Sequence, residues 1–224
     1  APAVQLRGHG PWGGSSHDRL AQYIPLLLLL WIGAQPLARW QRRLLLVSAL
    51  AVSLGMLALR LPRYAELDAQ LLEYRSVGRW LPRGATLLPL GYAHRGLTGD
   101  GGALSERTWP FRHAADWFVA ERGVVNLDDY EAEVPFFPVV LRAGYDPYRL
   151  LGSSLDRMPA CVRLDRFNRL APRPAEFVLL WEARSVARGE ACSEQLFAVL
   201  QQDYRLVFTS EPGGRAELYR YVGH

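Results

Sequence analysis

The 224-residue chain contains no Lys, so all 26 of its basic residues are Arg. The arginines are spread over both halves of the chain, often beside Asp or Glu, and no basic run is longer than Arg42-Arg43. Nucleic-acid-binding proteins usually carry a basic stripe along one element. The distribution therefore argues against a nucleic-acid partner, despite a net charge of +4.

Cysteine is also scarce. Cys161 and Cys192 have neither the spacing of a metal site nor a CxxC redox motif. In an oxidising compartment they could form one disulfide that closes a loop of about thirty residues, and the alternative is two unrelated buried thiols. A Gly-x-Ser-x-Gly nucleophile motif is missing as well. The sequence therefore predicts no metal, no cofactor and no catalytic residue.

Charge is missing from two apolar segments, Leu20 to Leu37 and Leu44 to Leu59, of eighteen and sixteen residues. These lengths are close to the lower limit for crossing a hydrocarbon core of about 30 Å. A soluble helix pair normally shows a polar stripe along each helix, and neither segment has one. The sequence predicts a transmembrane helical hairpin over residues 20–61, and the alternative is an unusually apolar helix pair in a soluble protein.

The turn predicted between these segments, residues 38–43, contains Arg39, Arg42 and Arg43 and no acid. The positive-inside rule places such a turn in the cytoplasm. Residues 1–19 then form an extracytoplasmic loop, and residues 62–224 lie on the periplasmic side of an inner membrane. The chain begins with Ala and shows no signal-peptide pattern before the hairpin, so we expect it to be the C-terminal part of a longer protein.

Residues 62–224 have the mixed composition of one α/β domain, and its boundary is predicted near Pro62. Apolar residues at spacings of three and four predict an amphipathic helix over 64–81, with Glu66, Asp68 and Glu73 on its polar faces. Strands alternating with helices predict a mostly parallel sheet with an antiparallel hairpin at its C-terminal edge. The other predicted elements are strands over 85–90, 124–127 and 176–181, helices over 113–122 and 193–202, and hairpin strands over 204–210 and 216–222.

Two loops in this domain contain candidate ligand-binding residues. The glycine-rich loop 91–112 follows a predicted strand, and its His94 and Arg95 could contact an anion; the alternative is a flexible surface loop. The acidic stretch 128–133 could bind a hard cation such as Ca²⁺, but it lacks EF-hand spacing and is read as a solvated loop.

His17 and Arg19 lie just before the first apolar segment. In a spanning hairpin this position is close to the level of lipid phosphates, and an Arg can pair with a phosphate in a bidentate manner. The alternative is that these residues anchor the chain at the membrane surface and that Asp18 caps the following helix.

The first apolar segment, HDRLAQYIPLLLLLWIGAQPL, is followed by an arginine-rich turn, a second apolar segment and LLEYRSVGRWLPRGATLLPL. This arrangement, over about residues 16–90, resembles the C-terminal end of bacterial polytopic glycosyltransferases of the GT-C type. Those enzymes use polyprenyl-phosphate-linked sugars and carry an extracytoplasmic α/β domain, often entered through a turn like Leu81-Pro82-Arg83-Gly84.

The resemblance implies that Arg19, in its setting with Tyr23 and Pro25, contacts a lipid phosphate. The family's catalytic acid lies in an early extracytoplasmic loop, to which nothing in this chain corresponds. We therefore expect a non-catalytic C-terminal portion of a membrane glycosyltransferase, with the bilayer, preceding transmembrane helices and a lipid-linked sugar as partners. The rival expectation is a non-enzymatic, membrane-anchored module that binds another molecule.

Overall fold

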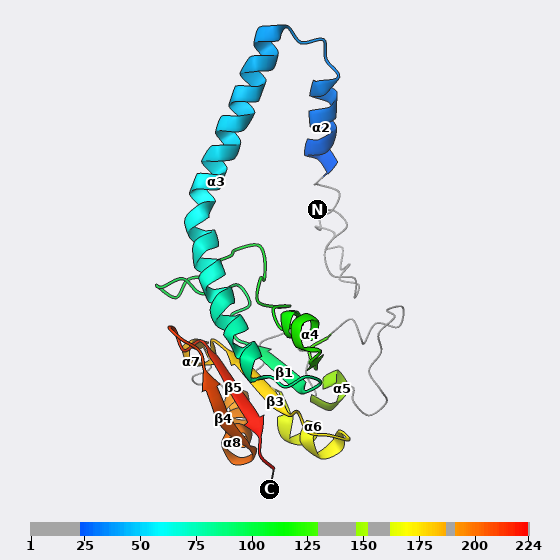
Figure 1. Ribbon diagram of the computed structural model, residues 1–224, viewed down its shortest axis with the longest axis vertical. Helices are drawn as coiled ribbons and strands as arrows, with labels where there is room; N and C mark the ends of the chain where they lie inside the picture. Colours follow the sequence, from blue (N-terminus) through cyan, green and yellow to red (C-terminus); the bar gives the residue numbers. More distant parts are fainter. Residues whose placement is uncertain (1–22, 130–146, 152–161, 187–190, 224) are drawn as a thin grey trace, which may run out of the picture. The chain divides into compact units, whose positions relative to one another are not determined.

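The computed structural model describes residues 23–129, 147–151, 162–186 and 191–223 (Figure 1). The chain separates into two units, Ala1–Leu59 and Arg60–His224. The first unit contains α2 (Tyr23–Gly33) and the beginning of α3 (Arg39–Arg75), which continues into the second unit. The second unit then contains η1 (Ser76–Trp80), β1 (Thr86–Gly91), α4 (Asp116–Arg122), β2 (Val125–Asn126), α5 (Pro147–Leu151), α6 (Leu164–Leu170), β3 (Phe177–Trp181), α7 (Ala183–Val186), α8 (Ala191–Asp203), β4 (Tyr204–Thr209) and β5 (Ala216–Tyr221).

The helix α3 is 37 residues long and continues through Pro62. The sequence predicts two separate helices on either side of this proline, and the structure corrects that prediction. A proline removes one backbone donor and crowds the carbonyl four residues earlier, but it can kink a helix without ending it. Among the described helices, α3 is the one that is long and apolar enough to cross a membrane, whereas α2 has 11 residues. A long apolar helix followed by an α/β domain is therefore confirmed.

The connection between α2 and α3 lies at residues 34–38, not at 38–43 as predicted. The Gln41 side-chain oxygen accepts a hydrogen bond from the Ala38 N–H at 2.9 Å, as in one half of a capping box. This contact starts α3 at Arg39, so Arg39, Arg42 and Arg43 belong to its first turns. Cations are unfavourable at the positive end of a helix dipole, so helix stability does not account for these arginines.

The domain contains a five-stranded mixed sheet with strand order β2-β1-β3-β5-β4. The β1 strand is parallel to both β2 and β3, whereas β5 is antiparallel to both β3 and β4. The predicted parallel arrangement is confirmed only for this first half. The predicted C-terminal hairpin forms, but β5 lies inside the sheet and β4 forms the edge. The first residues of β5 are fully buried, whereas Arg205 and Leu206 on β4 are exposed, which explains this order.

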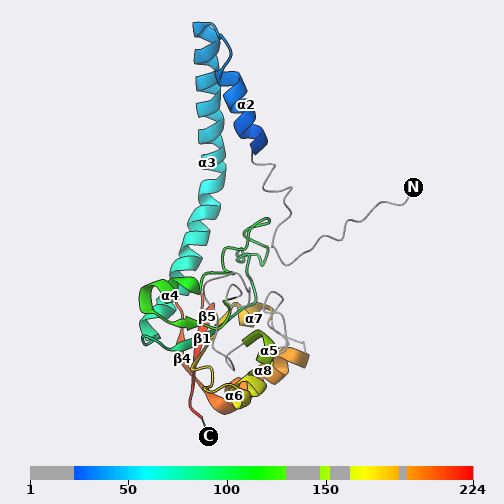
Figure 2. The same cartoon turned by 90° about the vertical axis from the view of Figure 1, so that its right-hand side faces the viewer.

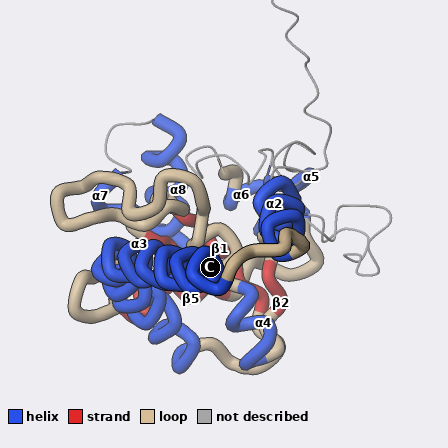
Figure 3. Tube along the Cα trace, turned by 90° about the horizontal axis from the view of Figure 1, so that it is seen from above, coloured by secondary structure: helices blue, strands red, loops and turns tan. Residues whose placement is uncertain are grey.

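Helices cover both faces of the sheet, with α4 on one face and α5, α6 and α8 on the other (Figures 2 and 3). The β3 strand shows how one run of residues fills both cores. Phe177, Leu179 and Trp181 pack with the end of α3 and with α4, and the alternate residues Val178 and Leu180 pack with α6 and α8. Successive side chains of β3 point to opposite faces of the sheet, and both faces are covered. Every residue of the strand is therefore buried, which explains its continuous apolar sequence.

The glycine after α4 ends this helix as predicted. Gly123 has a φ of +64°, and its N–H donates to the carbonyls of Phe118 and Val119. A left-handed residue at this position is the common way to end a helix, and glycine adopts it without steric cost. The helix itself begins at Asp116, three residues later than predicted, because the preceding residues form tighter turns.

The ionisation of Tyr204 can be used to test how deeply its hydroxyl is buried in the core. Its buried hydroxyl donates to the Ala175 carbonyl at 2.9 Å and accepts from Asn168 Nδ2 at 3.1 Å. Burial raises the pKa of Tyr204 well above its ordinary value, so the phenol stays neutral in the fold while the unfolded chain ionises. Stability is therefore present below about pH 10 and is lost as the pH rises further. Replacing Tyr204 with Phe should cost about 1 kcal/mol at neutral pH and reduce this alkaline loss.

Urea unfolding of the full chain in detergent, followed by tryptophan fluorescence at increasing pH, measures both effects. The exposed Tyr23 serves as the control, because Tyr23→Phe should leave the stability at neutral pH unchanged. An alkaline loss that is equally steep in Tyr204→Phe and in the parent would contradict the assignment.

Candidate functional site

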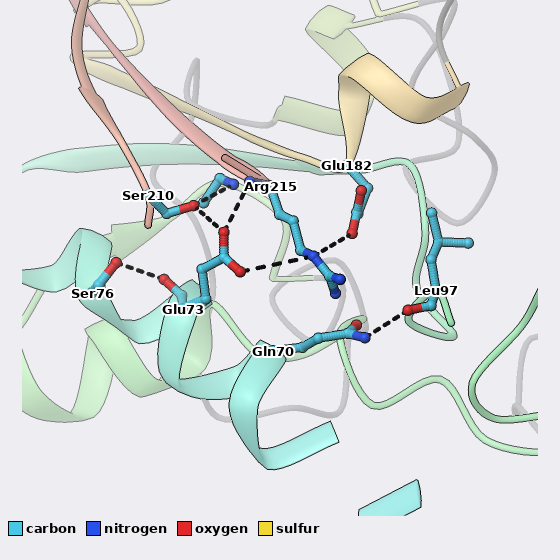
Figure 4. A network of polar contacts seen from close by, with 8 residues as sticks. Gln70, Glu73, Ser76, Leu97, Glu182, Ser210 and Arg215 are labelled. Atoms are coloured by element: carbon cyan, nitrogen blue, oxygen red, sulfur yellow. Dashed lines mark hydrogen bonds and ion pairs between the residues drawn. The ribbon is translucent and has the colours of Figure 1, made fainter. Parts of the chain in front are cut away.

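Polar side chains gather at one edge of the sheet, where β3 and β4 end and β5 begins. Glu182 follows β3, Ser210 follows β4, and Arg215 directly precedes β5. In open α/β sheets this carboxyl edge is where ligands commonly bind. Figure 4 shows these side chains together with Glu73 and Gln70 from the last turns of α3. We call Glu73, Glu182, Ser210 and Arg215 the carboxylate cluster.

Glu73 is the centre of the cluster, and its side chain is only 5% exposed. Its Oε1 accepts a hydrogen bond from the Ser210 hydroxyl at 2.7 Å and one from the Arg215 backbone N–H at 3.0 Å. The Ser210 hydroxyl oxygen in turn accepts from the Ala216 N–H at 2.9 Å. A carboxylate buried without partners would be costly, so these donors are what allow Glu73 to lie at the sheet. The sequence predicts Glu73 on a polar helix face, and its burial corrects that prediction.

The Arg215 guanidinium lies between two carboxylates. Its Nε is 3.8 Å from Glu73 Oε2 and 3.4 Å from Glu182 Oε1. Glu182 has a φ of +58°, a conformation uncommon for a residue with a side chain, and its N–H donates to the Arg215 carbonyl at 2.7 Å. Both backbone and side chain of Glu182 therefore hold Arg215. Nη1 of Arg215 is buried and has no hydrogen-bond partner among the described residues.

Gly213 lies against the cluster from the turn between β4 and β5. A Cβ at this position would be 2.9 Å from both Glu73 Oε2 and Arg215 Nε. Carbon atoms do not approach polar side-chain atoms so closely, so glycine is the residue that fits here without displacing the ion pair. The Pro212-Gly213-Gly214 turn that the sequence predicts between the two strands is thus also part of the cluster's wall.

Gln70 connects the same helix to the glycine-rich loop. Its Nε2 donates to the Leu97 carbonyl at 2.6 Å, and the side chain is almost fully buried. Its Oε1 has no hydrogen-bond partner among the described residues. Gly96, with a φ of +70°, comes so close that a Cβ there would be 2.9 Å from Oε1. The loop is therefore fixed to α3 by a buried contact on the helix face that also carries Glu73.

The contacts of the carboxylate cluster are structural. Both of its carboxylates are paired or hydrogen-bonded inside the domain. The cluster connects α3 to the turn between β4 and β5, because Glu73 contacts Ser210 and Arg215, which lie 137 and 142 positions later in the chain. Removing one member of a buried ion pair leaves the other charge buried and uncompensated, which typically costs about 3–5 kcal/mol. The cluster therefore determines how the last turns of α3 attach to the sheet.

His94 and Arg95, predicted as anion contacts, contribute backbone atoms that hold the loop in place. The His94 carbonyl accepts from the Phe111 N–H, and the Arg95 carbonyl accepts from the Ser105 N–H, each at 3.1 Å. The His94 ring is half-buried and stacks on Trp109 with ring centroids 6.2 Å apart, and the Arg95 side chain is exposed. The role predicted for their side chains stays a prediction.

Several other predicted residues lie outside the described part of the chain. Arg19, His17 and Cys161 are outside it, and so is the side chain of Cys192 in α8, so the lipid contact and the disulfide stay predictions. Asp128 and Asp129 of the acidic stretch are described and half-buried. Within the described residues, no group of three or more His, Cys, Asp or Glu is arranged to hold a metal ion.

A second arrangement was not predicted from the sequence. An open cavity of about 460 Å³ lies between α3 and residues 104–108. The side of the cavity formed by α3 is lined by Arg60, Arg63, Tyr64 and Leu67. The opposite side is formed by loop residues 104–108, which include Arg107. We call it the arginine cavity. The spacing of three, four and seven residues along α3 is the local signal that these side chains share one helix face, but the loop opposite them could not be placed from the sequence.

Comparison with known proteins gives no match. No protein-family model fits the chain, and no curated protein or solved structure is significantly similar to it. No family is therefore assigned to the chain on these grounds.

The carboxylate cluster predicts a specific response to the loss of Arg215. Arg215→Ala should destabilise the domain by about 3–5 kcal/mol at neutral pH, because Glu73 and Glu182 then lose the cation between them. Chemical unfolding of the variant and the parent at neutral pH measures the difference.

Arg220, exposed on β5, is the matched control, and Arg220→Ala should change the stability by no more than about 0.5 kcal/mol. A loss in Arg215→Ala no larger than in Arg220→Ala would show that the two carboxylates do not depend on Arg215.

Proposed function

We propose that the chain is the C-terminal part of a membrane protein, in which α3 and the apolar segment Leu20 to Leu37, which contains α2, cross the bilayer and carry the α/β domain. The observation that carries this proposal is the exposure of the apolar residues of α3. None of the residues in its most apolar stretch is buried, and the side chains of Leu46, Val47 and Val52 are each about two-thirds exposed. In water such a surface is unfavourable at about 25 cal/mol per Å², whereas a bilayer accepts it.

The arginines at the start of α3 support an orientation for this protein. Arg39, Arg42 and Arg43 lie where helix electrostatics disfavour positive charge, which is consistent with a topological role. In the proposed topology they face the cytoplasm, and the α/β domain faces the periplasm of an inner membrane.

For the whole protein we propose glycosyl transfer from a lipid-linked sugar, with this chain as its non-catalytic end. The support is the resemblance of residues 16–90 to GT-C-type enzymes, in which a Leu-Pro-x-Gly turn leads into the α/β domain. Here residues 81–84 lie in the connection between η1 and β1, which spans residues 81–85, and Gly84 takes a φ of +74°. The rival is an anchored module without enzymatic activity, which shares the same helices and domain.

Membrane insertion and topology can be measured on the full chain. After alkaline extraction of membranes, we expect the protein to stay with the lipid. In a background in which Cys161 and Cys192 are replaced by Ala, a membrane-impermeant maleimide should label Gln201→Cys in α8 from outside the cell. Trp40→Cys at the start of α3 should react only after permeabilisation.

Both positions are exposed on their own units, so a lack of labelling is not a result of burial. Labelling of both cysteines from the same side would contradict the topology, and release of the chain by alkali would contradict membrane insertion.

The glycosyl-transfer proposal has its own test in the full-length protein. Arg19→Ala should lower transfer from a polyprenyl-phosphate-linked sugar by about tenfold, since a charge-assisted contact to phosphate contributes about 1.5–3 kcal/mol. Arg7→Ala, in the same N-terminal stretch, is the control and should transfer at the parent's rate. Equal activity of Arg19→Ala and the parent would remove Arg19 from the site, and a full-length protein without transfer activity would favour the anchored module.

A further inference from the structure

The arginine cavity carries an excess of positive charge that the protein does not neutralise. Arg60, Arg63 and Arg107 line it, and Glu106 is the acid among its lining residues. None of these three guanidinium groups has a hydrogen bond or an ion pair within the described residues. Other arginines of the domain form salt bridges with carboxylates: Arg75 pairs with Glu121, and Arg184 pairs with Glu217. Three unpaired guanidinium groups around one cavity are suited to an anion with several oxygen atoms.

The chemistry of the arginine side chain favours a phosphate group as the bound anion. A guanidinium offers a planar fork of donors that matches carboxylate and phosphate oxygens, and phosphate has enough oxygens to serve more than one fork. A volume of about 460 Å³ is in the range of pockets that hold small ligands, so the cavity accepts more than a phosphate alone. Glu106 can accept hydrogen bonds from hydroxyl groups beside that phosphate.

The cavity's place along α3 identifies the source of the phosphate. Arg60 directly follows the sixteen uncharged residues Leu44 to Leu59 of the same helix. In the proposed membrane protein, Arg60 therefore lies where the hydrocarbon ends and the phosphates of the lipids begin. Tyr64, about half-exposed one turn further on, is a residue type enriched at this level. This step rests on the membrane insertion proposed above.

The loop that closes the cavity is held in place by defined contacts. Leu97 forms an antiparallel bridge with Ala103, and its carbonyl accepts from Gln70 of α3. The Ser105 N–H donates to the Arg95 carbonyl, and the Ser105 hydroxyl accepts from the Thr108 N–H at 3.2 Å. These contacts hold the loop around Arg107 beside the helix face of Arg60 and Arg63, so the three arginines are brought together before a ligand arrives.

We propose that the arginine cavity binds the headgroup phosphate of an anionic phospholipid, with Arg60, Arg63 and Arg107 as its ligands. The site attaches the α/β domain to the surface of the leaflet from which α3 emerges. It is distinct from the predicted contact at Arg19, because it takes a structural lipid and acts at the domain, not at the N-terminal end of the hairpin.

Native mass spectrometry of the full chain in detergent tests the site, with phosphatidylglycerol, phosphatidylcholine and inorganic phosphate added separately. We expect the chain to retain phosphatidylglycerol in preference to phosphatidylcholine. The variant Arg60→Gln/Arg63→Gln/Arg107→Gln should bind phosphatidylglycerol at least about tenfold more weakly, because three charge-assisted contacts are lost. The single variant Arg107→Gln leaves α3 unchanged and should show a smaller loss, which keeps the test valid if the triple variant misfolds.

The matched control is Arg173→Gln/Arg205→Gln/Arg220→Gln, which removes three exposed arginines of the same domain outside the cavity. It should bind the lipid as the parent does. Equal weakening in the control would show general attraction to a basic protein and overturn the site. Undiminished binding in both cavity variants would overturn it directly, and tighter binding of inorganic phosphate than of the lipid would overturn the lipid as its source.

This measurement does not require α3 to span a membrane, since the lipid is presented in detergent. Failure of membrane insertion appears in alkaline extraction, and failure of the cavity appears in lipid retention by the variants, so the two proposals are distinguished. A chain that resists extraction but shows no lipid preference keeps the membrane proposal and overturns the cavity.

Discussion

The α/β domain depends on the buried contact between Glu73 and Arg215. Apolar residues supply most of the stabilisation on both faces of the sheet, but apolar packing tolerates small shifts of one element over another. A buried carboxylate does not, because its hydrogen-bond donors must lie within about 3 Å. Glu73 meets a serine hydroxyl, a backbone N–H and a guanidinium that come from the turn between β4 and β5. This contact therefore specifies how α3 lies on the sheet within the domain.

The same contact sets the rotation of α3 about its axis, and so decides what the rest of its face meets. Gln70 lies three residues before Glu73 and reaches the Leu97 carbonyl in the glycine-rich loop. Two to four turns earlier on the helix, Arg60 and Arg63 face residues 104–108 of that loop across the arginine cavity. The carboxylate cluster, the contact between Gln70 and Leu97 and the arginine cavity therefore all depend on the orientation of α3.

The local elements were predictable where neighbouring residues determine them. The alternation in β3, the glycine that ends α4 and the hairpin of β4 and β5 all follow from short-range patterns. The place of β5 inside the sheet did not follow, because tertiary contacts decide it. The continuation of α3 through Pro62 did not follow, because a proline can either end a helix or only kink it. Glu73 looks like a solvated residue until Arg215, 142 positions later, is placed beside it. Arg60 and Arg63 likewise line a cavity only together with residues 104–108. No sequence periodicity predicts that this loop lies beside α3.

The outer strand of the sheet has a further consequence. β4 is an edge strand of six residues, its pairing with β5 is irregular between Leu206 and Phe208, and Arg205 projects from it. Irregular pairing and charge at an edge oppose the addition of a strand from another molecule. The backbone that this edge presents is therefore a poor template for aggregation. Such protection matters most for a domain held at high local concentration on a two-dimensional surface, where identical edges meet more often than in free solution.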